Sequence, residues 1–84
     1  MPTLVAHVAD PEPRTLMIYA TNPGWKIVVE KMDGASTLVA DRWEEKLSDI
    51  PRYIREFAIG EISWVDQGTG QTIDLAAFVA QHTG

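Results

Sequence analysis

Two turn signals in the first half of the chain constrain its fold more than any other feature. Asn22-Pro23-Gly24 places a proline, with its fixed φ, before a glycine that accepts positive φ. Asp33-Gly34 is the strongest short hairpin signal in the sequence and suits a two-residue type I′ turn with positive φ at Gly34. The segments beside these turns have the length of strands, which predicts consecutive antiparallel hairpins.

Strand patterns fill the segments between the turns. Residues 14–21 carry apolar side chains on both faces of an alternating pattern, which predicts a central strand. Residues 25–32 are rich in β-branched side chains, and residues 35–41 are expected to pair back on them. Residues 3–9 form a small apolar segment before Pro11 and Pro13. The first half therefore reads as an antiparallel meander.

The main helix is predicted over residues 48–59. An apolar stripe at helical spacing would start it near Asp41 if taken alone, and it consists of Trp43, Leu47, Ile50, Ile54 and Phe57. However, Pro51 is tolerated only in a first turn, while Ser48 is a good N-cap and Gly60 a good C-cap. Residues 42–46 are then a strand end or a short separate turn. We expect Ile50, Ile54 and Phe57 to be buried against the sheet, together with some of Leu16, Ile18, Ile27, Val29, Val39 and Ile62.

The remaining residues predict a second, smaller set of elements. Residues 61–66 alternate as a strand, residues 67–70 form a turn, and residues 71–73 pair back briefly. Asp74 caps a short helix over residues 75–81. We predict one α+β domain over residues 1–84, with an antiparallel sheet of four to six strands and both helices on one face.

Composition excludes several functions. The 84 residues include 7 Lys and Arg against 12 Asp and Glu, which gives a net charge of −5 and argues against direct nucleic-acid binding. There is no cysteine, which excludes disulfides, thiolate zinc sites and a catalytic thiol. The first residues have no basic start, and no apolar run approaches the length of a membrane span. We expect a cytoplasmic protein of a prokaryotic cell or a phage, with no membrane partner.

No residue pattern predicts catalysis. His7 and His82 lie near opposite ends of the chain, and no serine has the context of a nucleophile. Four acidic residues could be proposed as a divalent-cation cluster, but a solvated loop explains them as well: Asp33, Asp41, Glu44 and Glu45. We expect no catalytic residue, no metal ion and no cofactor, and therefore no enzyme.

The tryptophans point to binding. Three are many for 84 residues, and tryptophan is enriched both at binding hot spots and in small cores that need a large buried area. Core packing is favoured for any single one, but we expect at least one of Trp25, Trp43 and Trp64 to be exposed on a contact face. The predicted partner-binding residues are Asp41, Trp43, Glu44 and Glu45, because loops between elements often carry function. The alternative is that Trp43 covers the end of the core.

Part of the chain resembles the HicB-type antitoxin domain, which has a degenerate RNase-H-like fold. Gly24-Trp25 opens the strand Lys26-Ile27-Val28-Val29-Glu30 as in that family, and residues 47–59 are similar to its helix. The resemblance covers residues 15–59. Lys31-Met32-Asp33-Gly34 replaces the Pro-x-x-Pro-Gly element of the family, and the DNA-binding tail is absent. The resemblance implies a toxin-binding module without operator binding.

These observations predict a small acidic protein that binds a partner protein with a basic surface and inhibits or masks it. An antitoxin, an immunity protein or a phage-encoded inhibitor would fit, since complementary charge accelerates association. One alternative is a homo-oligomeric structural or assembly protein whose strand edges pair between chains, so a homodimer is possible. A small metal-dependent nuclease-like enzyme is the least favoured alternative.

Overall fold

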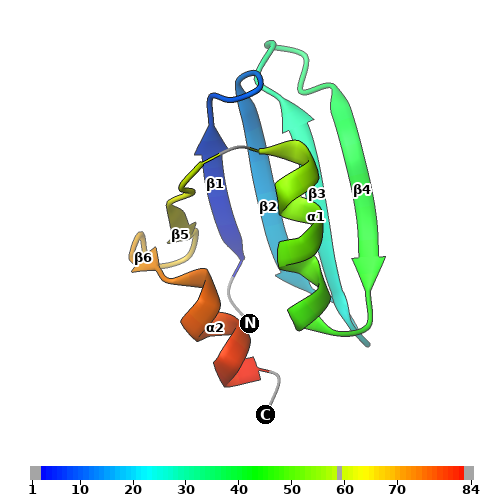
Figure 1. Ribbon diagram of the computed structural model, residues 1–84, viewed down its shortest axis with the longest axis vertical. Helices are drawn as coiled ribbons and strands as arrows, with labels where there is room; N and C mark the ends of the chain where they lie inside the picture. The colour runs from blue at the N-terminus through cyan, green and yellow to red at the C-terminus, as the bar shows by residue number, and fades with distance from the viewer. Residues whose placement is uncertain (1–2, 59, 83–84) are drawn as a thin grey trace.

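A six-stranded antiparallel sheet forms the body of the protein, in a computed structural model that describes residues 3–58 and 60–82 (Figure 1). The strand order is β4-β3-β2-β1-β5-β6. The strands are β1 (Leu4–Val8), β2 (Arg14–Ala20), β3 (Trp25–Lys31), β4 (Leu38–Glu44), β5 (Trp64–Asp66) and β6 (Thr72–Ile73). Two helices complete the fold, which confirms the predicted α+β class.

The first four strands form a meander in which each strand pairs with the next. β2, β3 and β4 are the predicted meander, and β1 extends it by one strand. β1 also pairs with β5, so the chain returns to the free side of its first strand after crossing over the sheet. β2 lies inside the sheet between β1 and β3, as the two apolar faces of residues 14–21 predicted.

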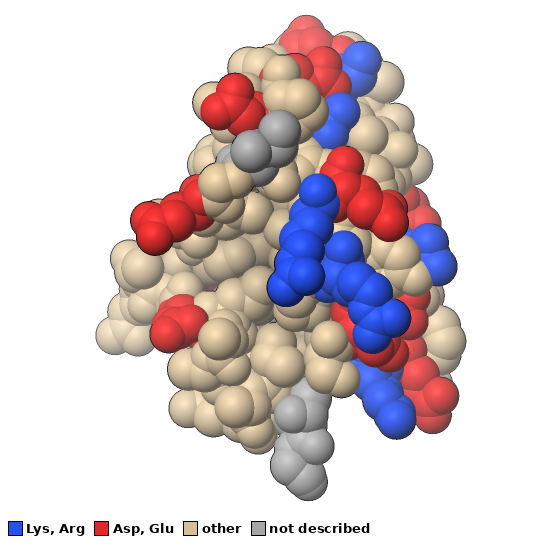
Figure 2. Space-filling view, viewed as in Figure 1, with Lys and Arg blue, Asp and Glu red and all other residues tan. Residues whose placement is uncertain are grey.

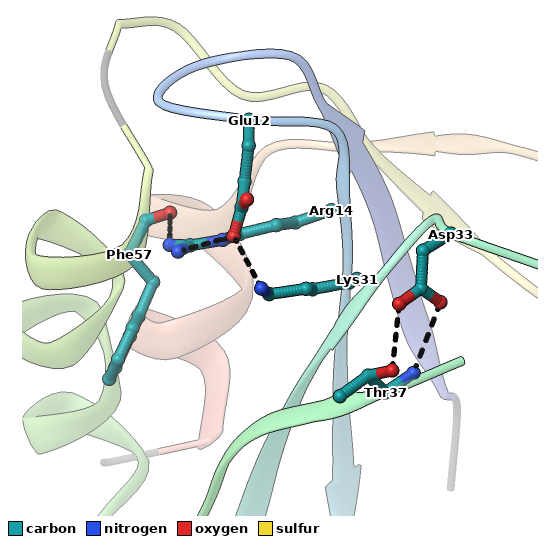
Figure 3. A network of polar contacts seen from close by, with 6 residues as sticks. All are labelled: Glu12, Arg14, Lys31, Asp33, Thr37 and Phe57. Atoms are coloured by element: carbon teal, nitrogen blue, oxygen red, sulfur yellow. Dashed lines mark hydrogen bonds and ion pairs between the residues drawn. The ribbon is translucent and has the colours of Figure 1, made fainter. Parts of the chain in front are cut away.

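The connection between β3 and β4 is wider than the predicted two-residue type I′ turn. Gly34 has the expected positive φ of +82°, but Ser36 also has a positive φ of 52°. The Asp33 carboxylate accepts hydrogen bonds from the Ala35 amide (3.0 Å) and the Thr37 hydroxyl (2.7 Å), as Figure 3 shows for Thr37. Because Asp33 bonds forward along the chain, the loop extends to Thr37, and β4 starts at Leu38 rather than Ala35.

The main helix has a different start from the one predicted. A single 3-10 turn, η1 (Leu47–Asp49), leads directly into α1 (Ile50–Phe57), with Pro51 in the first turn as expected. The prediction of Ser48 as N-cap is wrong, because Ser48 lies inside η1 and no side-chain hydrogen bond caps either segment. Residues 42–44 continue β4, so the helix does not begin near Asp41.

The end of α1 is also earlier than predicted. Ala58 is extended, with φ −149° and ψ 146°, so the helix stops at Phe57; residue 59, its predicted end, lies outside the described residues. The Arg14 guanidinium donates to the Phe57 carbonyl oxygen (2.8 Å) and to the Glu12 carboxylate (2.9 Å), while Lys31 lies 3.9 Å from Glu12 (Figure 3). Arg14 on β2 thus satisfies a helix-end carbonyl that would otherwise be unpaired.

The second helix, α2 (Leu75–His82), follows β6 directly. The Asp74 carboxylate accepts a hydrogen bond from the Ala76 amide (3.0 Å), which confirms the predicted cap. Phe78 of α2 meets Trp25 of β3 edge to face, with ring centroids 5.8 Å apart. The His82 ring meets Trp25 edge to face at 5.7 Å and lies tilted over Phe78 at 4.2 Å, so aromatic contacts hold the final turn of α2.

Both helices cover the same face of the sheet, and the core lies between them and the strands (Figure 1). Ile50 and Ile54 are buried as predicted, whereas Phe57 at the end of α1 is only half-buried against the core. The buried strand residues are Leu4, Ala6, Leu16, Ile18, Trp25, Ile27, Val29 and Trp64. Over the described ranges, no helix has the length and apolar character needed to cross a membrane.

Candidate protein-interaction face

The face of the sheet opposite the helices has no element packed against it in the described part of the chain; we call it the open face. Side chains alternate along a strand, and residues directly opposite one another in an antiparallel pair point to the same side. Because Leu16 and Ile27 point into the core, Met17 and Val28 must point to the open face. The strand register therefore gives the composition of this face.

An apolar row crosses the open face at its centre. Val65, Val5, Met17 and Val28 lie directly opposite one another on four adjacent strands, and the row ends at Asp41 on β4. We call this the middle row. Its four apolar side chains are partly exposed, since the covered face takes the fully buried residues.

Two further rows flank the middle row. The Trp43 row lies on one side and consists of Tyr19, Lys26 and Trp43. The Leu38 row lies on the other side and consists of His7, Thr15, Glu30 and Leu38. Trp43 is 49% exposed and Leu38 is 56% exposed, whereas Trp25 and Trp64 are buried. Large apolar side chains thus stand at both corners of the β4 edge.

Trp43 is held in a fixed position although half of it faces solvent. Its indole Nε1 donates to the Thr21 hydroxyl (3.1 Å) and to the Pro23 carbonyl oxygen (3.0 Å) in the β2–β3 turn. The ring lies on Gly24, where an added Cβ would be 2.6 Å from Nε1. Trp43 therefore covers this turn and also presents a rigid apolar surface at the corner of the open face.

The charged groups of the open face are few and partly paired. Lys26 lies 3.0 Å from Asp41, and this carboxylate beside it raises the pKa of the Lys26 ammonium. Glu30 lies on the same strand as Lys26, on the far side of Val28. His7 is hydrogen-bonded to Thr15 on this face, whereas His82 is exposed at the end of α2 beside Trp25, so the two histidines lie on opposite sides of the sheet.

The four predicted binding residues do not form one acidic surface. Trp43 and Asp41 lie on the open face, but Glu44 points to the helix side, because it is opposite the buried Trp25. There it lies 3.3 Å from Arg42, whose guanidinium stacks 3.8 Å from the centre of the Tyr53 ring. The Glu44 carboxylate raises the pKa of the Tyr53 phenol. Glu45 follows the strand and is exposed.

Sequence reasoning missed most of the open face. The sequence predicts strands for Met17, Val28 and Leu38 and a small apolar segment for Val5, but it does not bring them together, although the second apolar face of residues 14–21 is visible in it. Apolar residues on both faces predict a central strand, but they do not distinguish a covered face from an open one. In a sheet with helices on one side only, the same pattern leaves an apolar surface facing outward.

The helix side of the molecule has a different character. Figure 2 shows Lys and Arg side chains gathered at the centre of this side and acidic side chains spread around them. Arg52 and Arg55 project from α1 and are exposed. A hollow of about 490 Å³ lies between α1 and the β6–α2 segment, with the core residues Ile54 and Trp64 in its lining.

No protein-family model, curated protein or solved structure matches this chain. The comparison with the HicB-type domain therefore has no further support, and the case for a function depends on the geometry of the open face.

Proposed function

We propose that this protein is a non-catalytic protein-binding module whose binding surface is the open face. The observation that supports this most directly is the middle row, in which four apolar side chains lie side by side on four uncovered strands. A two-layer α+β domain normally leaves a polar surface on the uncovered side of its sheet. A contiguous apolar strip at that position is typical of a surface that another protein covers.

The flanking residues support the same proposal. Trp43 is anchored by two hydrogen bonds and so loses little side-chain freedom on binding. Tyr19 and Trp43 are the residue types that dominate binding energy at interfaces. The Lys26–Asp41 pair connects the end of the middle row to the Trp43 row and gives the surface a polar element that can fix orientation.

A substitution at the centre of the middle row tests this proposal. Met17→Lys places a charge among the apolar residues, but its long stem can extend to solvent, so we expect the fold to remain. Ala77→Lys adds the same charge on the exposed surface of α2 and is the matched control. Immobilised parent and Ala77→Lys should retain the same binding protein, whether another protein or further copies of this chain, and Met17→Lys should lose it. Equal retention by all three would contradict the proposal.

A second candidate is inhibition of a basic partner at the corner formed by Trp43 and Glu45. The net charge of −5 favours it, as does the exposed Glu45, which has no ion pair among the described residues and follows the strand that carries Trp43. An antitoxin, immunity or phage-encoded inhibitor would work in this way. A charge reversal at Glu45 tests this candidate. The variant is Glu45→Lys alone, because reversing the charge of Glu44 would also disrupt its contact with Arg42.

The two substitutions at this corner have separate expected effects. Glu45→Lys should slow association with a basic partner at low salt, since it acts on long-range attraction. Trp43→Ala should raise the dissociation rate by the equivalent of about 2 kcal/mol if Trp43 is a hot spot. Unchanged binding kinetics in both variants would exclude this corner from the interface.

A further inference from the structure

We infer that the partner of the open face is a second copy of this chain, packed face to face about a two-fold axis that runs along the middle row. This inference rests on the proposed function, because it names the partner for the same surface. The arrangement of charged and apolar side chains in the Trp43 row and the Leu38 row supports it.

Two of the three charges of the open face have opposite sign on the two sides of the middle row, and the third, Asp41, lies at the end of the row itself. Lys26 and Glu30 lie two residues before and two residues after Val28 on β3, and all three point to the open face. A two-fold axis along the middle row exchanges these two positions. Lys26 of each copy then lies over Glu30 of the other, so the dimer contains this pair of opposite charges twice. Lys26 would be placed between its own Asp41 and the second copy's Glu30.

The apolar groups follow the same symmetry. Trp43 and Leu38 lie on β4 on opposite sides of the middle row, at 49% and 56% exposure. The same two-fold axis brings Trp43 over Leu38 of the second copy, and covers both. Tyr19 comes to lie over Thr15 in the same way, and the apolar residues of the middle row pack against their own copies. Asp41, at the end of the row, comes to lie near Asp41 of the second copy, with Lys26 beside each carboxylate. Each strand of one sheet then runs along the corresponding strand of the other, as in an aligned β-sandwich.

The size of the open face is sufficient for such a dimer. Five strands at a spacing of about 4.8 Å and three rows about 6.6 Å apart give, with side-chain margins, roughly 24 × 20 Å on each copy. The two copies together would bury about 1,000 Å², which is the lower limit for a specific interface. We therefore expect a reversible dimer that dissociates on dilution.

Net charge does not oppose this packing strongly. The open face carries Lys26, Glu30 and Asp41, for a net charge of 1 − 2 = −1. The chain has −5 in total, so −5 − (−1) = −4 lies elsewhere on the molecule. Most of the negative charge of each copy thus lies outside the interface. Solvent and salt screen the repulsion between those exposed charges.

Two charge-reversal variants, measured separately and as a mixture, test the inference. In Lys26→Glu both flanking positions on β3 are acidic, and in Glu30→Lys both are basic. Each variant alone should dimerise at least about tenfold more weakly than the parent in sedimentation equilibrium, because like charges meet across the axis. An equimolar mixture should form heterodimers again, because each acid then faces a base. Arg55→Glu and Glu61→Lys change exposed charges away from the open face and should dimerise like the parent.

A cross-linking measurement on the unmodified chain supplements these variants, in case Lys26→Glu beside Asp41 does not fold. A zero-length carbodiimide reagent should link Lys26 to Glu30 between isotope-labelled and unlabelled copies in a mixed sample. Within one copy the two Cα atoms lie about 13 Å apart along the strand, which is too far for that link. The Lys26–Asp41 link, at 3.0 Å within one copy, is the internal control.

Three results would overturn the inference: a parent chain that stays monomeric up to about 1 mM, a dimer unaffected by either charge variant, or mixed-label samples without the Lys26–Glu30 link. These results leave the proposed function to be decided by the Met17→Lys capture. If Met17→Lys loses a different protein while the parent is monomeric, the module binds that protein instead. If Met17→Lys also binds as the parent does, both proposals fail.

Discussion

Single residues fix the β2–β3 turn and the β3–β4 loop, and both do so through side-chain contacts with the backbone. Asp33 organises the β3–β4 loop by accepting hydrogen bonds from Ala35 and Thr37. Trp43 closes the β2–β3 turn from the other end of the strand. The Asp33-Gly34 signal correctly predicted a turn with positive φ at Gly34. It did not predict the length of the loop, because the Asp33 carboxylate accepts hydrogen bonds from residues as far along the chain as Thr37.

Asp33 should make stability depend on pH in the acid range. The Thr37 hydroxyl holds the pKa of Asp33 below its ordinary value of 3.8 in the folded protein. A lowered folded pKa adds stability that is present above the unfolded value and is lost as the pH falls through the folded value. The difference in unfolding free energy between the parent and Asp33→Ala should therefore narrow below about pH 3.8 in denaturant titrations. A difference that stays constant down to pH 2 would contradict this role.

Gly24 should be required for the position of Trp43. Its φ is +91°, and an added Cβ would be 2.6 Å from the indole nitrogen. Gly24→Ala should cost backbone strain of about 1–3 kcal/mol and also displace the ring. Gly34→Ala is the matched control, since its φ is +82° but nothing lies within 4 Å of the added Cβ. Denaturant unfolding followed by tryptophan fluorescence should show the larger loss in Gly24→Ala, and equal losses would show that the Trp43 contact is unimportant.

At the scale of elements, α1 shows what local sequence can and cannot predict. Pro51, which is tolerated only in a first turn, placed its start within two residues of α1, whereas the apolar stripe taken alone would have started the helix near Asp41. Its end at Phe57 depends on Arg14, which is 43 positions away in the sequence and bonds the last carbonyl. No local pattern around Phe57 contains that contact.

Burial along α1 should rank the cost of truncation. Ile54 is 6% exposed in the middle of the helix, so Ile54→Ala should cost about 2–5 kcal/mol. Phe57 is only half-buried at the helix end, so the loss for Phe57→Ala should be smaller than its size suggests. Thermal unfolding of the two variants checks the order, and a greater loss for Phe57→Ala would show that this ring belongs to the core.

Arg14 should be needed for the junction between β2 and α1. Its side chain is 14% exposed and bonds both Phe57 and Glu12. Arg14→Ala should cost about 1.5–3 kcal/mol, as expected for hydrogen bonds to a charged group. Glu12→Ala removes the ion pair but leaves the helix-end bond, and it should cost less. Chemical denaturation measures the loss of unfolding free energy in both variants. A larger loss in Glu12→Ala than in Arg14→Ala would show that the ion pair, and not the bond to Phe57, stabilises this junction.

At the scale of the whole molecule, the fold class was accessible from the sequence and the proposed binding surface was not. Turn residues and alternation are local, and they gave the strands, both helices and most of the core. The open face joins Val65, Val5, Met17 and Val28, which lie far apart in the chain and meet only through the strand register. The predicted site around Trp43 therefore includes one corner of this face, while Glu44 of the same group belongs to the other side.

Hydroxyl-radical footprinting tests the central proposal, that the open face is the surface through which this protein binds. Oxidation rates of Met17 and Tyr19 on the open face are compared with that of Tyr53 on the helix side, for the chain alone when dilute and with its partner bound. That partner is either a second copy at high concentration or a captured protein. We predict that Met17 and Tyr19 become several-fold slower to oxidise while Tyr53 is unchanged. Protection of Tyr53, with Met17 and Tyr19 oxidised as fast as in the dilute chain, would contradict it.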